Sequence, residues 1–220
     1  MANADLILGA EPSRKRSVRT EPTQRRSTQR LDALLDAAAE IVDETGFERL
    51  TTQMVAERAG ASIGTVYRYF PDRVAVLHAL RERSIRRYRE RVADEMERAE
   101  LATWWDVVDV ALDACAALYR DEPGFSVVHA GRRETADGDA EPEFAHRMAQ
   151  LIEHEFDLEP DGAELRFRLG IAIELGDALI NRAFERDAAG DERYLAEAKR
   201  LVHDYIAEHL GRARAASTAA

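Results

Sequence analysis

The sequence predicts an all-α protein with an N-terminal three-helix domain followed by a larger helical bundle. Two observations support this class: apolar residues recur every three or four positions from Leu31 onward, and the C-terminal half has no alternating strand pattern. The helices expected near the N-terminus are short and separated by glycines. The predicted organisation is a flexible basic arm over 1–27, the three-helix domain over 28–75, the bundle over 76–211 and a frayed tail over 212–220.

The composition is that of a soluble globular protein: 45% of the 220 residues are hydrophobic and 33% are charged. The single cysteine, Cys115, cannot form an intramolecular disulfide. There is no basic and apolar leader pattern and no apolar run long enough to span a bilayer. We therefore expect a cytoplasmic protein with no membrane partner.

The net charge of -11 is unevenly distributed. Residues 1–30 carry seven basic and three acidic groups, whereas residues 101–220 carry 13 basic and 25 acidic groups. A phosphate backbone responds to the field within a Debye length, about 8 Å at physiological salt. The acidic total therefore does not exclude an anionic partner at the basic end.

The first elements follow from start and stop signals. Residues 1–27 contain two prolines and little apolar periodicity, which is typical of a flexible arm. Thr28 can cap a first helix that Gly46 ends. Its inward face consists of Leu31, Leu34, Leu35, Ala38, Ile41 and Val42.

Two short helices come next. Thr51 or Thr52 can cap one that ends at Gly60, and Ser62 can cap another that runs through Tyr69 and ends before Pro71. Two short helices joined by about three residues around a glycine form a helix-turn-helix, whose second helix lies in the DNA major groove.

The residue types of that second helix suit DNA. Gly64 removes a side chain where the helix must approach the duplex, and Thr65 offers a hydroxyl and a methyl group. Tyr67 and Tyr69 supply phenolic hydroxyls, and Arg68 supplies a guanidinium. The same arrangement also occurs as simple packing in helical proteins, and the tyrosines could be residues at the edge of a core.

The stretch RLDALLDAAAEIVDETGFERLTTQMVAERAGASIGTVYRYFPDRVAVLHAL carries a family resemblance over roughly residues 28–80. The Gly46-Phe47 pair, the Thr51-Thr52 pair and above all Thr65 to Phe70 followed by Arg73 resemble the N-terminal domain of the TetR family of transcriptional regulators. The resemblance implies an all-helical homodimer that represses by binding a palindromic operator and releases DNA when a small molecule enters the C-terminal domain.

Carried over position by position, the resemblance gives the candidate DNA contacts. Ile63 departs from the family pattern, because that position is often polar or basic. It either contacts a thymine methyl group or makes no base contact. The candidates are Arg30, Thr51, Thr52, Ser62, Ile63, Gly64, Thr65, Tyr67, Arg68, Tyr69 and Arg73, with Arg14, Lys15, Arg16 and Arg19 in the arm.

The rest of the chain predicts further helices. A long one starts at Val74 and continues through Met96, and others cover Trp104–Tyr119, 143–156, 162–187 and 191–210, with a short segment near 124–130 and a polar loop over 132–141. The last two have more apolar residues than one core face needs. The resemblance implies that they form a dimer interface, with Phe167, Ile171, Leu175, Leu179, Phe184, Leu201 and Tyr205 as candidates.

An effector pocket between helices would be apolar with a few polar groups. Glu174, Asp177 and Asn181 share one helix face by their spacing, and this stripe could bind a cationic or hydroxylated ligand, be exposed to solvent or lie at the dimer seam. The full set of candidates is Trp104, Trp105, Tyr119, Phe125, His129, Glu174, Asp177 and Asn181.

Two alternatives to a ligand-responsive repressor remain. One is a helix-turn-helix regulator controlled by a protein partner or acting as an activator. The other is a metal-dependent helical-bundle enzyme built on Glu143 and His146, but this Glu-x-x-His occurs once, whereas di-iron bundles contain two. No Gly-rich phosphate loop, Gly-x-Ser-x-Gly or cysteine pair is present. We therefore expect no enzymatic activity, no metal and no cofactor.

Overall fold

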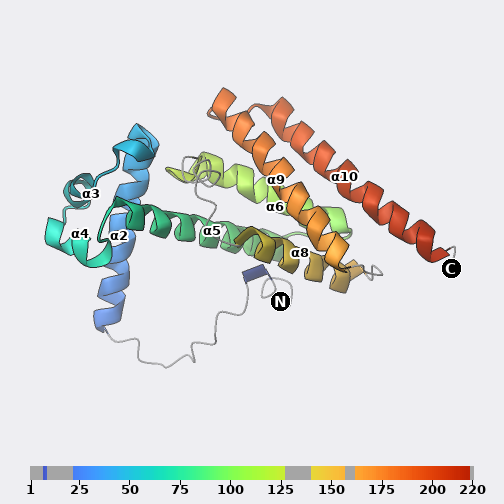
Figure 1. The fold of residues 1–220 in the computed structure, drawn as a ribbon, viewed down its shortest axis with the longest axis horizontal. Coiled ribbons are helices and arrows are strands. Elements are labelled where there is room, and N and C mark those ends of the chain that lie inside the picture. The colour runs from blue at the N-terminus through green and yellow to red at the C-terminus, as the bar shows by residue number, and fades with distance from the viewer. Residues whose placement is uncertain (1–6, 9–21, 127–139, 157–161, 219–220) are drawn as a thin grey trace. The chain divides into compact units, whose positions relative to one another are not determined.

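The computed structural model describes residues 7–8, 22–126, 140–156 and 162–218, and all regular secondary structure within them is helical (Figure 1). The chain forms two compact units. One, the helix-turn-helix unit, comprises residues 11–87 and 121–136, and the other, the C-terminal unit, comprises 1–10, 88–120 and 137–220. None of the described helices is both long and apolar enough to cross a membrane.

The helix-turn-helix unit contains α2 (Pro22–Thr45), the 3₁₀ turn η1 (Phe47–Arg49), α3 (Thr52–Arg58), α4 (Ile63–Tyr69) and the first part of α5 (Arg73–Arg98). α2 ends where Gly46 adopts a φ of 79°, a conformation that glycine reaches without strain. All of these helices contribute to one apolar cluster: Leu34, Leu35, Ala38, Ala39, Ile41, Val42, Leu50, Val55, Ala56, Val66, Phe70, Val76 and Leu80.

The C-terminal unit contains the rest of α5, α6 (Trp104–Asp121), α8 (Ala140–Phe156), α9 (Gly162–Arg186) and α10 (Glu192–Thr218). Its core draws on all five helices, with Met148, Leu151, Leu169 and Ile206 among the most deeply buried side chains. α9 packs along both α8 and α10. A β-carbon at Gly176 of α9 would lie 2.7 Å from a methyl group of Leu112, so α6 and α9 approach closely there.

The residues that follow α6 are attached to α2 at a glycine. Gly124 has a φ of 71°, and its backbone N–H donates to Asp43 Oδ1 at 2.9 Å. A β-carbon at this position would lie 2.7 Å from the carbonyl oxygen of Ala39. Gly124 is therefore required both by its backbone conformation and by the closeness of α2.

Most predicted helices lie where the sequence placed them, but three boundaries were wrong. α2 begins at Pro22 rather than near Thr28, because proline is favoured in the first turn of a helix as well as at helix stops. α10 continues to Thr218, so the predicted tail is helical over most of its length. The short turn η1 was not predicted. α8 begins at Ala140 rather than at residue 143, so the last two residues of the predicted loop 132–141 are helical. The rest of that loop and most of the arm lie outside the described residues.

The two compact units do not coincide with the predicted division at residue 75. The helix-turn-helix unit includes α5 up to Arg87 and the residues that follow α6. We keep the predicted boundaries as a proposal in which residues 28–75 bind DNA and residues 76–211 bind the effector and form the dimer.

Glycine-to-alanine substitutions at Gly124 and Gly60 separate steric from conformational effects. Both glycines have positive φ, but a β-carbon at Gly60 meets nothing within 4 Å. We expect Gly60→Ala to lower the free energy of unfolding by about 1–2 kcal/mol through the left-handed conformation alone. Gly124→Ala should cost clearly more, because the new methyl group also meets the Ala39 carbonyl. Urea unfolding of both variants measures the difference, and equal losses would contradict the close contact.

Candidate nucleic-acid interface

Capping side chains define where the two helices of the helix-turn-helix begin. The hydroxyl of Thr51 accepts a hydrogen bond from the Met54 N–H at 3.1 Å, and that of Ser62 accepts one from the Thr65 N–H at 3.2 Å. The Ser62 and Thr65 hydroxyls also lie 2.9 Å apart. Each hydroxyl satisfies a donor that the first turn of a helix leaves free. The predicted starts of α3 and α4 are confirmed.

Gly60 and a few buried residues set the turn between the two helices. Gly60 has a φ of 60°, and the N–H of Ala61 returns to the carbonyl of Ala56 at 2.9 Å. Val55 and Val66 are fully buried on facing sides of the turn. Burial of Val66 and Phe70 turns the opposite face of α4 outward.

That outward face carries the residues expected to read DNA. Ile63 and Tyr67 are exposed by 36% and 53%. Arg68 and Gly64 are also exposed, and Thr65 is half-buried. A methyl-bearing side chain, a phenol and a guanidinium on one exposed helix can contact bases and phosphates in a groove.

Tyr69 has a different environment from Tyr67. It is half-buried against the apolar cluster, and its hydroxyl lies 3.0 Å from Ser27 Oγ on α2 and accepts from Arg68 at 3.2 Å. The hydrogen bond with Ser27, followed by that with Arg68, lowers the pKa of the phenol. Tyr69 therefore links α4 to the beginning of α2, a role that the sequence did not indicate.

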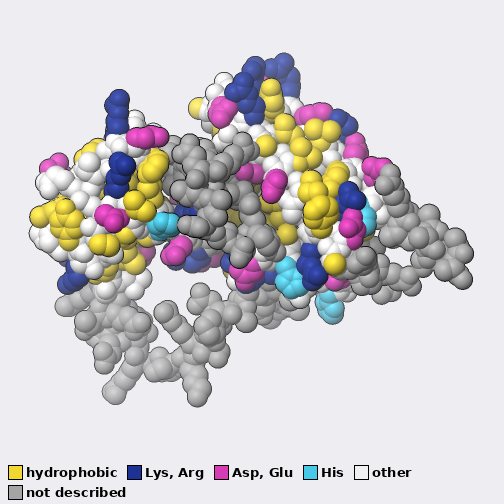
Figure 2. Space-filling view, viewed as in Figure 1, with side chains coloured by type: hydrophobic (Ala, Val, Ile, Leu, Met, Phe, Trp, Pro, Cys, Tyr) yellow, Lys and Arg dark blue, Asp and Glu magenta, His cyan; other side chains and the backbone are white. Residues whose placement is uncertain are grey.

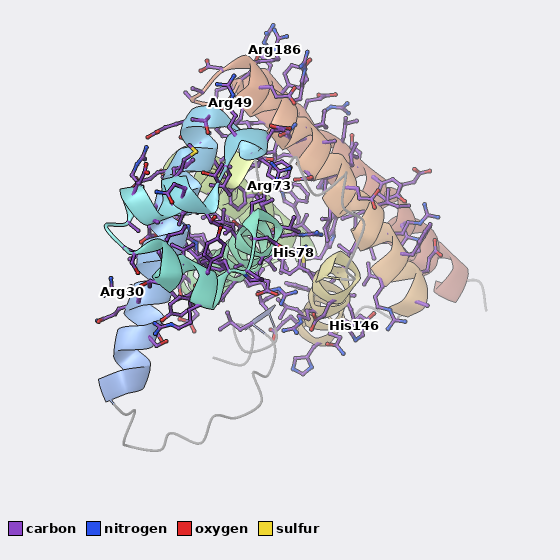
Figure 3. All side chains as sticks on the ribbon, turned by 60° about the vertical axis from the view of Figure 1, so that its left-hand side comes forward. Arg30, Arg49, Arg73, His78, His146 and Arg186 are labelled. Carbon is purple, nitrogen blue, oxygen red and sulfur yellow. The ribbon has the colours of Figure 1, made fainter. Side chains whose placement is uncertain are left out.

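The remaining candidates flank the helix-turn-helix. Figure 3 shows Arg30 projecting from α2 and Arg73 at the start of α5. Thr52 is half-buried in the first turn of α3. Arg73 donates to the Glu48 carbonyl at 3.0 Å and lies over the Phe47 ring, so part of its guanidinium holds η1. The arm candidates Arg14, Lys15, Arg16 and Arg19 lie outside the described residues.

Two arginines that the sequence reading missed fix the helices around α2. Arg58 of α3 forms ion pairs with Glu40 at 3.1 Å and Glu44 at 2.7 Å, both exposed. Arg83 of α5 is only 5% exposed and donates to Asp36 Oδ1 at 2.7 Å and to the Leu35 carbonyl at 3.1 Å. Burial lowers the pKa of its guanidinium.

A signal for Arg83 was present in the sequence. Val76, Leu80 and Arg83 follow one another at spacings of four and three, so the arginine occupies a position that an apolar residue would take on a core-facing helix. Arg87, one turn later, pairs with Glu122 and reaches Asp36 at 3.7 Å.

The structure brings some of the predicted effector contacts together in pairs. Within the C-terminal unit, Tyr119 donates to Asn181 at 3.3 Å, whereas Trp104 and Trp105 pack around His203. Glu174 is exposed and Asp177 is half-buried on α9. Phe125 belongs to the helix-turn-helix unit, and His129 lies outside the described residues.

The predicted dimer contacts differ in their exposure and in the side chains that they already contact. Phe167 of α9 is 59% exposed, and Ile171, Leu175 and Leu179 are half-buried. Phe184 stacks on Tyr119, and Tyr205 accepts a hydrogen bond from Arg168 at 3.1 Å. Leu201 is half-buried on α10. In Figure 2, hydrophobic and charged side chains are mixed over α9 and α10.

The residues of the alternative metal site contact arginines. Glu143 accepts hydrogen bonds from Arg147 on its own helix, and His146 Nδ1 lies 3.3 Å from Arg166. Among the residues that the structure describes, no group of three or more His, Cys, Asp or Glu could hold a metal ion.

The short capped helices, the glycine turn and the exposed polar face of α4 define a DNA-binding domain of the helix-turn-helix class. Comparison with known proteins identifies the family. Residues 34–80 match the model of bacterial regulatory proteins of the tetR family, and residues 102–210 match the model of the tetracyclin repressor-like C-terminal domain.

Individual relatives agree with both matches. A crystal structure of a TetR-family transcriptional regulator from Streptomyces coelicolor is 34% identical, with a TM-score of 0.69 over 81% of this chain and 98% of that one. The transcriptional repressor KstR of Mycolicibacterium smegmatis is 35% identical over 95 residues, which are 43% of this chain but only 38% of that repressor.

A third protein is similar in fold alone. The regulator FadR from Bacillus subtilis, crystallised with stearoyl-CoA, is 15% identical, with a TM-score of 0.63 over 80% of this chain and 97% of that one.

The two family matches and the Streptomyces coelicolor regulator show that the chain belongs to the TetR family of transcriptional regulators.

The contact between Arg83 and Asp36 can be tested from both sides. Asp36→Ala leaves a buried guanidinium with one acceptor fewer, and we expect a loss of about 1–3 kcal/mol in the free energy of unfolding. Arg83→Met removes one donor to the Leu35 carbonyl and leaves a half-exposed Asp36 carboxylate that water can solvate, so no buried charge is left unpaired and its cost should be smaller. Chemical denaturation of the two variants gives the comparison. A larger loss for Arg83→Met would contradict this description.

Proposed function

We propose that this TetR-family regulator represses transcription as a homodimer that binds a palindromic operator and is released by a small-molecule effector. The observation that carries the proposal is the exposed face of α4, where Ile63, Tyr67 and Arg68 project from a helix whose other face is buried. The family's own DNA-binding region is the part of the chain matched over residues 34–80.

The candidate residues on α4 and on the neighbouring helices differ in the part of DNA that they suit. Tyr67 and the hydroxyls of Thr51 and Thr52 suit phosphate oxygens, which fix the register of the protein on the duplex. Arg68 and Ile63 suit base edges, because a guanidinium can donate twice to guanine and an aliphatic group can contact a thymine methyl. Arg30 and the basic arm add an electrostatic contribution that depends on salt.

The dimer supplies the symmetry of the operator. Two copies of α4 related by a two-fold axis read half-sites whose centres lie about 34–36 Å apart, or a multiple of that distance. The exposed Phe167 and the half-buried apolar residues of α9 support a self-complementary interface on this helix. The C-terminal family match also supports this assignment.

Effector release requires a conformational link between the two units. α5 is one continuous helix from Arg73 to Arg98 and contributes to both. A ligand that favours one position of its C-terminal part would therefore shift the population of DNA-binding geometries. Stearoyl-CoA in FadR supports an organic effector here.

Selection from random DNA duplexes, followed by sequencing, tests the DNA-binding part of this proposal. We expect a palindrome, and on that duplex Tyr67→Phe and Arg68→Ala should weaken binding by about tenfold or more, since each removes a hydrogen bond to DNA. Arg98→Ala provides a charge-matched control on the other unit and should leave the Kd within about twofold at constant salt. Retention of DNA without sequence preference would instead favour a partner-dependent regulator.

The dimer interface is tested by one exposed residue. Phe167→Glu should shift the protein from dimer to monomer in sedimentation equilibrium, because it places a charge in an apolar contact. Val74→Glu makes the same change at another exposed apolar residue, 49% exposed at the start of α5, and should remain dimeric. A dimer of unchanged stability with Phe167→Glu would rule out this part of α9.

A further inference from the structure

The hydroxyl of Tyr69 joins the C-terminal end of α4 to α2 through a complete set of hydrogen bonds. It donates its proton to the Ser27 carbonyl oxygen at 3.4 Å. Its oxygen is then left to accept from Ser27 Oγ at 3.0 Å and from Arg68 Nη2 at 3.2 Å. These contacts use the hydrogen-bonding capacity of the phenol, so little of it remains for DNA.

The guanidinium of Arg68 is held by Tyr69 in two ways. Besides the hydrogen bond, its Cζ lies 5.0 Å from the centroid of the Tyr69 ring, which is within the range of a cation–π contact. The ring is itself half-buried against the apolar cluster, so it offers a fixed surface. Arg68 is exposed, and a guanidinium has several more N–H groups that can donate outward.

Tyr67 provides the contrast on the same helix. Its side chain is 53% exposed, and within the described part of the chain its hydroxyl has no hydrogen-bond partner. The hydroxyl of Tyr67 is therefore available to an outside acceptor or donor, whereas that of Tyr69 is engaged. Two tyrosines of one short helix thus differ in what they can do for DNA.

We propose that Tyr69 is a positioning residue that, anchored by Ser27, fixes the guanidinium of Arg68 for base reading and makes no DNA contact of its own. This role differs from the direct contact that the family resemblance implies for Tyr69. The inference rests on the proposed function, which supplies the DNA that Arg68 reads.

Positioning of an arginine affects specificity more than total affinity. A free arginine side chain loses rotamer entropy when it forms a bidentate contact, and one that is already fixed loses less. The gain applies only where the base edge matches the orientation of the fork, as guanine does through two acceptors. A mismatched base gains nothing, so the discrimination between bases increases.

The first experiment compares binding to the selected duplex with binding to duplexes that carry one changed base pair in each half-site. We expect Tyr69→Phe to lower discrimination about threefold or more at the base pair that Arg68→Ala also ceases to discriminate. Ser27→Ala should lower it less, because the Ser27 carbonyl still accepts from Tyr69. Tyr67→Phe removes the same group from the same helix and should weaken binding to every duplex by a similar factor.

A double-mutant cycle separates positioning from a merely structural role. In the Arg68→Ala protein, adding Tyr69→Phe should change neither the affinity nor the base preference, whereas adding Tyr67→Phe should weaken binding as it does in the unmodified protein. If the loss with Tyr69→Phe persists without the Arg68 side chain, or if it is equal on every duplex, the positioning role is overturned.

The order of Arg68 is also measurable without DNA. NMR relaxation of its Nε–H group, assigned by its absence in Arg68→Lys, reports how rigidly the side chain is held. We expect an ordered group in the unmodified protein and a mobile one in Tyr69→Phe, with Tyr67→Phe unchanged. Equal mobility in all three proteins would overturn the proposal. If the selection recovers no preferred sequence, the proposed function fails, and this measurement still decides whether Tyr69 positions Arg68.

Discussion

The proposed DNA-reading surface depends on the burial of Val66 and Phe70. α4 has seven residues, and an isolated helix of that length is not stable in water. It exists because these two side chains enter the apolar cluster of the helix-turn-helix unit and because Ser62 caps its first turn. The same contacts decide which side chains face outward. The contacts that form α4 therefore also place Ile63, Tyr67 and Arg68 on its exposed face.

Around this cluster, α2 is held by polar contacts from three directions. Arg58 approaches from α3, Arg83 from α5, and the Gly124 N–H from the residues that follow α6. Exposed ion pairs contribute little stability on their own, but the buried guanidinium of Arg83 has few alternative arrangements. This restricts how α5 can lie against α2 within the unit, and α5 is the helix that continues into the C-terminal unit.

The sequence predicted the helix-turn-helix well because its signals are local: Thr51 and Ser62 cap, Gly60 turns, and apolar spacing identifies the buried side. Two residues were misjudged from the sequence. Pro22 was interpreted as part of an arm, although proline also begins helices. Arg83 was not recognised as a buried residue, because arginine is usually exposed. Contacts between distant segments cannot be found from spacing within one helix. Phe125 belongs to a different unit from Tyr119 and Asn181, and Ile7, which is buried, lies in a segment of arm-like composition.

We propose that α4, held by its buried face, is the element that contacts DNA. Hydrogen–deuterium exchange of the protein with and without its selected duplex tests this most directly, because it reports on each backbone segment separately. We expect DNA to slow exchange in peptides covering residues 51–73 and the beginning of α2, with smaller changes elsewhere. Unchanged exchange over 51–73, with protection confined to α8, α9 or α10, would contradict it.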